Sequence, residues 1–253
     1  MQVRPTPPLC KHATGEMEEY VQKAIQRGLS TIIFLEHLET GIQYHPPSWL
    51  DKEEFAYYFE EGARLQQRYR GRIEVRLGVE TGYNREAVST IRERLAQYPW
   101  HRIGLSCHFH AHEGSYLNLL SRRQESLQRL TAIGVDQVVT DYFNALIEAI
   151  GVIDCDVLCH LDAVLRHAPG IRLNEEHRRQ IEVLLDGMQA KGVALEINTS
   201  GFDYRGSPFP APWIIKGALE RGIPLWAGSD AHQPGDVGRY FDRLPEYLQR
   251  IQG

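Results

Sequence analysis

The sequence predicts an α/β fold, a distorted β/α barrel of about seven strands. Short apolar, β-branched runs alternate along the chain with amphipathic segments of helical period, which is typical of a parallel sheet. The length of 253 residues suits one barrel of this kind. Repeats, low-complexity segments and linker-like stretches are absent from the sequence, so we expect a single domain over residues 1–253. An open doubly wound sheet is the alternative.

The predicted strands are short runs bounded by helices or turns. They are a possible first strand at 2–6, then 31–35, 73–79, 102–107, 156–161, 194–198 and 223–227. The predicted helices between them are 15–27, 86–98, 136–150, 174–190 and 213–221. Gly28, Pro99 and Gly151 end the first three helices, and Asn174 is the N-cap of the fourth. Residues 41–70 predict a long loop plus a helix beside the barrel mouth.

Composition excludes several classes of protein. The formal charge of −5 argues against non-specific nucleic-acid binding, which needs a positive field. No stretch approaches the eighteen apolar residues of a membrane span, and residues 1–5 lack the pattern of a signal peptide. We therefore expect a soluble, cytoplasmic protein. The four cysteines have no disulfide or zinc-finger spacing and are expected to be buried, unreactive thiols.

Metal-capable side chains follow five of the predicted strands. They are Glu36 and His37, Glu80, His108, His160 with Asp162, and Asp230 with His232. In β/α barrels, functional groups from the carboxyl ends of several strands meet at one rim although they lie far apart in sequence. A lone histidine after a strand is usually structural, but five coincidences at one topological position favour a metal site.

The types of side chain indicate which metals would bind. Imidazole nitrogens with a few carboxylates suit zinc, manganese or iron, whereas magnesium and calcium prefer oxygen ligands. At least six candidate ligands predict more than one divalent ion. A carboxylate such as Glu80 can bridge two ions about 3.5–4 Å apart, the usual arrangement for hydrolysing phosphate esters.

The ordered set of motifs resembles the PHP superfamily (polymerase and histidinol phosphatase), and specifically its histidinol-phosphate phosphatase branch. The motifs extend over most of the chain and are Pro8 to Ala13, Glu36-His37, Gly78 to Glu80, Ser106 to His108, His160 to Asp162, Asn198 to Gly201 and Gly228 to His232. The resemblance implies a distorted (β/α)7 TIM-like barrel with three metal ions. It assigns His12, His37 and His232 to one ion, and Glu80, His108 and His160 to a second. A third would share Glu80 and take Asp230 with two histidines of an H-x-H motif.

The sequence departs from this pattern at the H-x-H motif, where it has Arg4-Pro5-Thr6. Arginine stays protonated and cannot be a ligand, and a threonine hydroxyl is a poor one. Three explanations remain: two ions instead of three, a weakened or altered activity, or a misread start of the sequence. His110 and His112 could substitute, although a polar loop is the simpler interpretation of that run.

The predicted function is a metal-dependent phosphomonoesterase acting on a small phosphorylated substrate, with L-histidinol phosphate implied by the resemblance. Glu80, Asp230 and His232 are the predicted catalytic residues, and Asp230 could orient the nucleophile or protonate the leaving group. Arg166 and Arg205 are predicted to bind the phosphate. The alternatives are a phosphoesterase acting on nucleotides or oligonucleotides, and a degenerate protein that binds without turnover.

Overall fold

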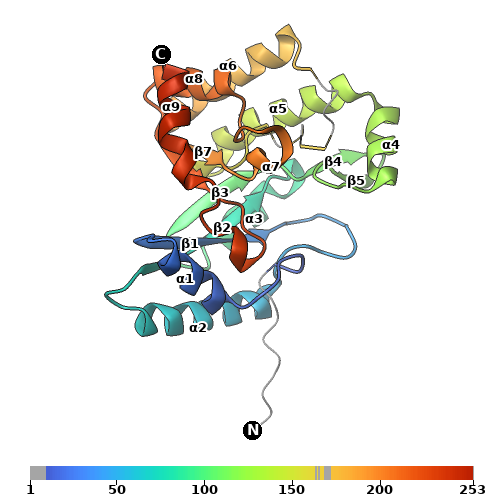
Figure 1. The fold of residues 1–253 in the computed structure, drawn as a ribbon. Coiled ribbons are helices and arrows are strands. Elements are labelled where there is room, and N and C mark those ends of the chain that lie inside the picture. Colours follow the sequence, from blue (N-terminus) through green and yellow to red (C-terminus); the bar gives the residue numbers. More distant parts are fainter. Residues whose placement is uncertain (1–9, 163, 165, 168–171, 253) are drawn as a thin grey trace.

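The computed structural model describes residues 10–162, 164, 166–167 and 172–252. Six parallel strands form one curled sheet in the order β1–β2–β3–β6–β7–β8 (Figure 1). Their bounds are β1 Thr31–Leu38, β2 Glu74–Gly82, β3 Arg102–Ser106, β6 Val157–Leu158, β7 Ala194–Asn198 and β8 Leu225–Gly228. This arrangement confirms the predicted α/β barrel. The possible strand at 2–6 lies outside the described residues, as do Arg4 and Thr6.

Helices connect the parallel strands. Their bounds are α1 Met17–Gln26, α2 Lys52–Arg68, α3 Val88–Leu95, α4 Gln124–Ile133, α5 Val135–Val152, α6 Glu175–Lys191, α7 Gly201–Arg205, α8 Pro212–Glu220 and α9 Leu244–Gln252. Helix α1 contacts β1 and α2 packs on β2, while α5, α6, α8 and α9 pack against one another in succession. Figure 1 shows α1 and α2 beside the β1 end of the curled sheet, and α6 and α8 beyond β7 toward its other end.

Strand β1 shows how the sequence sets the faces of the sheet. Buried and half-buried residues alternate along it, because successive side chains of a strand point to opposite faces. Ile32, Phe34 and Leu38 belong to the main hydrophobic core, whereas His37 points to the other face and lines the cavity described below. One strand therefore supplies both core packing and a site residue.

The segment after β3 differs from the prediction. The run that contains His110 and His112 forms an antiparallel hairpin, β4 Phe109–His112 with β5 Ser115–Asn118, and not a polar loop. Glu113 and Gly114, both with positive φ, make its turn, a conformation that glycine adopts without strain. The hairpin and α4 extend from the sheet beside the carboxyl end of β3 (Figure 1).

Strands β1 and β8 are the two edges of the described sheet. Residues 10–14, the bridging loop, connect these two edges at the carboxyl ends of the strands. The backbone N–H of Cys10 donates to the Glu36 carboxylate of β1 at 2.8 Å. The N–H of Thr14 donates to the carbonyl of His232, which follows β8, also at 2.8 Å. The bridging loop therefore fixes the position of His12 relative to both edges.

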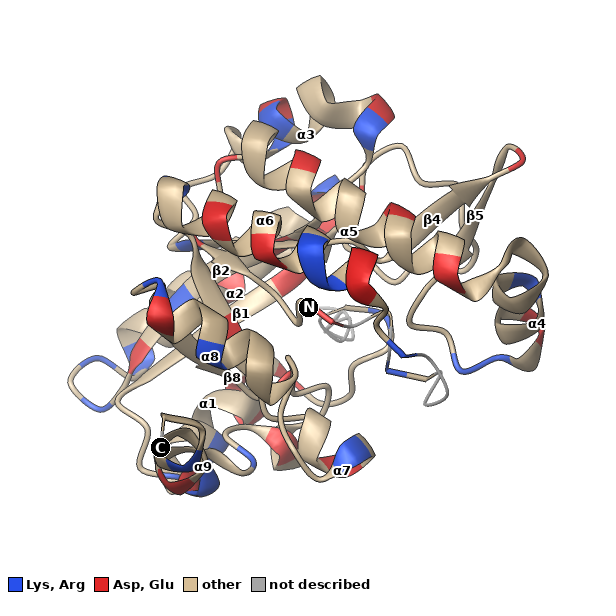
Figure 2. Ribbon diagram, turned by 90° about the horizontal axis from the view of Figure 1, so that it is seen from above, with Lys and Arg blue, Asp and Glu red and all other residues tan. Residues whose placement is uncertain are grey.

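The surface carries charges of both signs. Figure 2 shows acidic and basic residues interspersed along α6, whereas the charged residues of α5 are all acidic. None of the helices in the described ranges is long and apolar enough to cross a membrane.

Candidate active site and metal centre

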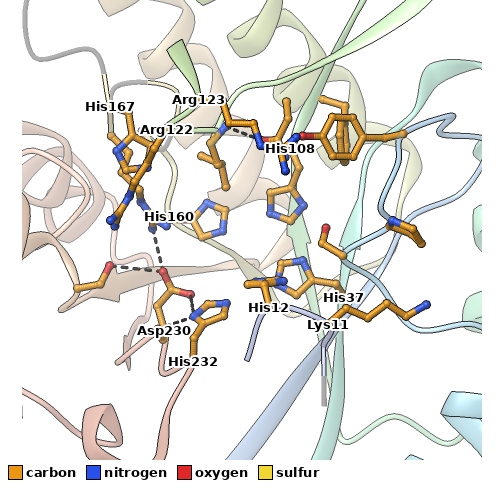
Figure 3. A pocket seen from close by; sticks show the side chains of 18 of the residues that line it. Lys11, His12, His37, His108, Arg122, Arg123, His160, His167, Asp230 and His232 are labelled. Carbon is orange, nitrogen blue, oxygen red and sulfur yellow. Dashed lines mark hydrogen bonds and ion pairs between the residues drawn. The ribbon is translucent and has the colours of Figure 1, made fainter. Parts of the chain in front are cut away.

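The predicted ligands converge at the carboxyl ends of the strands. His37 of β1 and Glu80 of β2 are direct partners in the parallel register, so their side chains project from neighbouring positions on one face. His108 follows β3, His160 follows β6, and Asp230 and His232 follow β8. Figure 3 shows the imidazoles from these separate segments turned toward one shared cavity.

Glu80 lies between two of the histidines. Its Oε1 atom is 2.8 Å from His160 Nε2 and 2.9 Å from His108 Nε2, and all three side chains are buried. The contact with His108 is close but lacks hydrogen-bond alignment. The Nδ1 atom of His108 pairs with Glu39 Oε1 at 2.7 Å. A carboxylate on the outer nitrogen is the usual way in which proteins orient a metal-binding imidazole.

A second cluster joins β1, the bridging loop and the segment after β8. The rings of His12 and His232 stack with centroids 4.5 Å apart, and those of His12 and His37 meet edge to face at 5.2 Å. The ligand atoms of these three histidines and the Cys10 Sγ all lie within 4.8 Å of one another. The structure therefore brings together every residue of the first predicted metal site, and adds a thiol.

Asp230 stands beside these clusters and is paired with Arg166. Arg166 Nη2 donates to Asp230 Oδ2 at 2.9 Å, and the Ser200 hydroxyl donates to the same oxygen at 3.4 Å. Both Asp230 and His160 have left-handed backbones, with φ of 48° and 28°. Such conformations cost about 1 kcal/mol or more in non-glycine residues and concentrate at functional sites, where they fix a side chain's direction.

The clusters form the floor of a cavity of about 560 Å³, a size suited to a small metabolite. Arg166, Arg122, Arg123 and Lys11 line the cavity and give it positive charge. Figure 3 shows Arg122 and His167 on the side of the cavity opposite to Lys11. Apolar and aromatic groups complete the wall, namely Tyr44, Pro46, Pro47, Phe109, Leu120 and Tyr204. The cavity therefore offers cationic side chains for an anion and an apolar wall for the rest of a ligand.

Burial and neighbouring charges set the protonation of the site. Desolvation lowers the pKa of His37 to about 3, so its imidazole is neutral and free to bind a cation. Burial would also lower the pKa of His108, but the Glu39 and Glu80 carboxylates outweigh it and raise that pKa to about 10. Burial would raise the pKa of Asp230, but Arg166 and His232 together hold it far below its ordinary range.

The low pKa of Asp230 bears on one predicted role. The carboxylate stays ionised at neutral pH, so in this state it can orient a group or hold a cation. The other expectation for this residue, that it protonates a leaving oxygen, stays a prediction.

Arg205 is placed differently from the prediction. Its Nη1 atom donates to Asp162 Oδ2 at 2.9 Å, and its guanidinium lies over the Phe209 ring at 4.1 Å. Asp162 is fully buried and also accepts the backbone N–H of Ala211 at 3.0 Å. Arg205 is not among the residues that line the cavity. In this geometry Arg205 has a structural role, because its positive charge compensates that of the buried Asp162 carboxylate.

His110 and His112 also lie apart from the clusters. They are on β4, where their rings stack on each other with centroids 6.3 Å apart. Neither belongs to a group of potential ligands within the described chain. The hairpin therefore does not bring these imidazoles into either cluster.

Sequence reasoning missed Glu39 and Cys10. Glu39 could have been found, because it lies two residues after His37 and a strand repeats its facing direction every two residues. Cys10 was interpreted as an unreactive buried thiol. All four cysteines are free, as expected, but only Cys10 among them belongs to a group of potential metal ligands in the described part of the chain.

The donor set fits divalent cations. Buried imidazole nitrogens and a shared carboxylate oxygen lie 2.8–2.9 Å apart around Glu80, so a separation of a few tenths of an ångström would give the spacing of about 3.3 Å between two ligands of one tetrahedral ion. His108 Nε2 and His160 Nδ1 are buried without a well-formed hydrogen bond, and unsatisfied buried polar atoms often mark an ion site. Zinc, manganese and iron bind such mixed nitrogen and oxygen sets.

Comparison with protein-family models gives the family. A model described as the PHP domain matches residues 6–200, and one described as PHP-associated matches residues 214–247. The chain belongs to the PHP family. The match spans more than half of the chain and includes most of the residues of the two clusters, and it confirms the prediction from the motifs.

Curated relatives place this PHP chain in the histidinol-phosphatase branch. It is 31% identical over 242 residues to the "Probable histidinol-phosphatase" of Deinococcus radiodurans, covering 94% of this chain and 89% of the relative. It is 28% identical to the histidinol-phosphatase of Bacillus subtilis, covering 94% and 96% of the two chains. The predicted class, a metal-dependent phosphatase, agrees with this branch.

Solved structures share the PHP fold. A Listeria monocytogenes protein assigned as a histidinol phosphatase has a TM-score of 0.84 at 21% identity, covering 93% of this chain and 96% of its own. Histidinol phosphate phosphatase from Lactococcus lactis, solved with zinc, L-histidinol and phosphate, has a TM-score of 0.77 at 19% identity, covering 96% and 90%. These likenesses support the distorted barrel.

Proposed function

We propose that this protein hydrolyses L-histidinol phosphate to L-histidinol and phosphate with two or three divalent ions, in the cytoplasm. The observation that carries the proposal is the convergence of seven predicted ligands from separate segments on one cavity, namely His12, His37, Glu80, His108, His160, Asp230 and His232. We take L-histidinol phosphate as the substrate because the relatives are histidinol-phosphatases. We propose zinc, manganese or iron as the metal, and no nucleic-acid partner.

We assign the residues of the chain as follows. His12, His37 and His232 would hold one ion, and Glu80, His108 and His160 another. Asp230 would contribute to a further ion next to Glu80. Bound divalent ions would supply positive charge for the phosphoryl oxygens and lower the pKa of a water molecule.

The remaining residues would bind and orient the substrate. Arg166 lines the cavity and keeps one guanidinium nitrogen on Asp230, so its other nitrogens can donate to a phosphate. Arg122 and Arg123 add charge near the rim. The aromatic wall of Tyr44 and Phe109, whose centroids are 5.1 Å apart, offers an apolar face to an imidazole ring.

The test is phosphate release from L-histidinol phosphate by the purified protein, together with metal analysis. The wild type should contain at least two ions and turn the substrate over, and chelation should abolish turnover. His232→Ala should lose both activity and metal. His112→Ala is the matched control, because it removes a histidine outside the clusters, and it should behave as the wild type. Full turnover by the chelated protein, or by His232→Ala, would contradict the proposal.

The second candidate, a phosphoesterase for nucleic acids, makes a different prediction in the same assay. Contacts with many phosphates make binding strongly dependent on salt, whereas a monoester in a small cavity involves few. Comparing salt titrations of hydrolysis for L-histidinol phosphate and for a short oligonucleotide separates the two substrates.

A further inference from the structure

The cluster at the bridging loop contains one ligand atom beyond the three histidines. Cys10 is 6% exposed, and its Sγ atom lies 3.9 Å from His12 Nε2. The same sulfur is within 4.8 Å of the ligand nitrogens of His37 and His232. Two ligands of one tetrahedral zinc ion lie about 3.3–3.7 Å apart, given Zn–N and Zn–S bonds of about 2.0–2.3 Å. The four atoms are thus spaced for a common ion after a small contraction.

The position of the thiol is fixed from two sides. The backbone N–H of Cys10 donates to Glu36 of β1, and the Ala13 N–H donates to the Cys10 carbonyl at 2.8 Å in a tight turn. This turn places residues 10 and 12 on the same side of the bridging loop. His12 is exposed and lines the cavity, while Cys10 is buried behind it, so a cation can reach the sulfur past the imidazole.

We propose that Cys10 is the fourth ligand of the ion held by His12, His37 and His232, a site with one sulfur and three nitrogens. The proposal rests on the proposed metal-dependent function. Thiolate ligands favour zinc over manganese, so this position should be selective for zinc. The ion would then have four protein donors, one sulfur and three nitrogens, at the wall of the same cavity as the ions around Glu80.

Cobalt substitution gives a readout that does not depend on activity. A thiolate bound to Co²⁺ produces a sulfur-to-metal charge-transfer absorption in the near ultraviolet. The metal-free wild type, titrated with Co²⁺ alone, should develop this band. Cys10→Ser should lose it, because a serine hydroxyl keeps the size and hydrogen-bonding capacity of the thiol but is a poor ligand. Cys155→Ser is the matched control, since Cys155 is half-buried and outside the clusters, and it should keep the band.

Zinc affinity provides the second measurement. Loss of an outer partner of a metal ligand costs roughly 10–100-fold in affinity, so loss of a direct ligand should weaken one zinc site by more than that in Cys10→Ser. Cys10→Ala should show the same loss if the cause is the missing sulfur. Circular dichroism of both metal-free variants should match the metal-free wild type and so exclude misfolding.

Two results would overturn the proposal, and they differ in meaning. In the first, the wild type takes up Co²⁺ and hydrolyses the substrate, but it has no charge-transfer band or Cys10→Ser keeps the band. Cys10 is then not a ligand, and the proposed function stands. If the wild type binds neither Co²⁺ nor Zn²⁺, the proposed function fails and this inference fails with it.

Discussion

His108 is contacted by carboxylates at both ring nitrogens, Glu39 at 2.7 Å and Glu80 at 2.9 Å. In the metal-free protein this arrangement stabilises the protonated ring and raises its pKa to about 10. When an ion binds, that proton must leave. The residue is therefore the point at which pH acts on both metal uptake and stability.

The metal-free protein should lose stability as pH rises from about 6.5 to 10. The folded state binds the His108 proton more tightly than the unfolded chain, whose histidine has the ordinary pKa of 6.5. The stabilisation is therefore complete below pH 6.5 and disappears as pH passes through 10. Urea unfolding at several pH values would measure it. In His108→Gln the free energy of unfolding should no longer fall between pH 6.5 and 10. An equal fall in that variant would mean that other groups cause it.

The two predicted phosphate-binding arginines should respond differently to substitution. Arg166→Gln removes charge from the cavity and should lower kcat/KM about 100- to 1000-fold; it also leaves the Asp230 carboxylate without its cation, so it should lower the free energy of unfolding as well. Arg205→Gln leaves the buried Asp162 carboxylate without its cation and should lower that free energy by about 1–3 kcal/mol. Its KM should stay near that of the wild type. Steady-state kinetics and urea unfolding of both variants test the contrast, and a larger KM change in Arg205→Gln would reverse the assignment.

At the scale of elements, the parallel strands and most helices were predictable, whereas the β4–β5 hairpin, α4, α7 and α9 were not. Strands β1, β2, β3 and β7 and helices α1, α5, α6 and α8 lie within a few residues of their predicted positions. Local apolar patterning determines these elements. The β4–β5 hairpin was missed because each of its strands has only four residues, too few for an alternating pattern to be told from a polar loop. The short α7 and the terminal α9 pack through contacts distant in sequence, which a local pattern does not contain.

Strand β2 can be tested at Gly78, where three strands approach closely. A Cβ atom there would lie 2.6 Å from the carbonyl oxygen of Arg102 and 3.1 Å from that of Phe34. Because backbone atoms cannot move aside easily, Gly78→Ala should lower the free energy of unfolding by about 1–3 kcal/mol. Gly151→Ala is the control. It lies in α5 with nothing within 4 Å of the new methyl group, and should add up to about 1 kcal/mol. Urea unfolding of both variants measures these free energies. A free energy of unfolding for Gly78→Ala equal to that of the wild type would contradict the packing argument.

At the scale of the whole molecule, the site depends on segments from His12 to His232. The convergence of these ligands followed from the sequence, because the carboxyl ends of parallel strands share one edge. Their pairing with Glu39 and Cys10 did not, since it depends on side-chain directions within the curled sheet. The occupancy of the third ion and the single-domain organisation of residues 1–253 stay predictions, the former because Arg4 and Thr6 lie outside the described residues.

Removal of the metals should lower the melting temperature. Ions that bind only the folded state stabilise it by about 2.7 kcal/mol each when present at 100 times their dissociation constant. The chelated wild type should therefore melt earlier in differential scanning calorimetry, and added zinc should restore it. Cys155→Ser should show the same difference. A melting temperature unaffected by chelation would mean that the ligand clusters are empty in the purified protein.

The bridging loop ties both edges of the sheet together, and it also carries His12 into the metal cluster. In a cell short of zinc, the proposed ion, copies without metal would lack the link through His12 and His232, and the loop would hold the edges by its hydrogen bonds and packing alone. Such copies should open there first and be degraded sooner, so the abundance of the protein should follow the zinc supply even when its synthesis is constant.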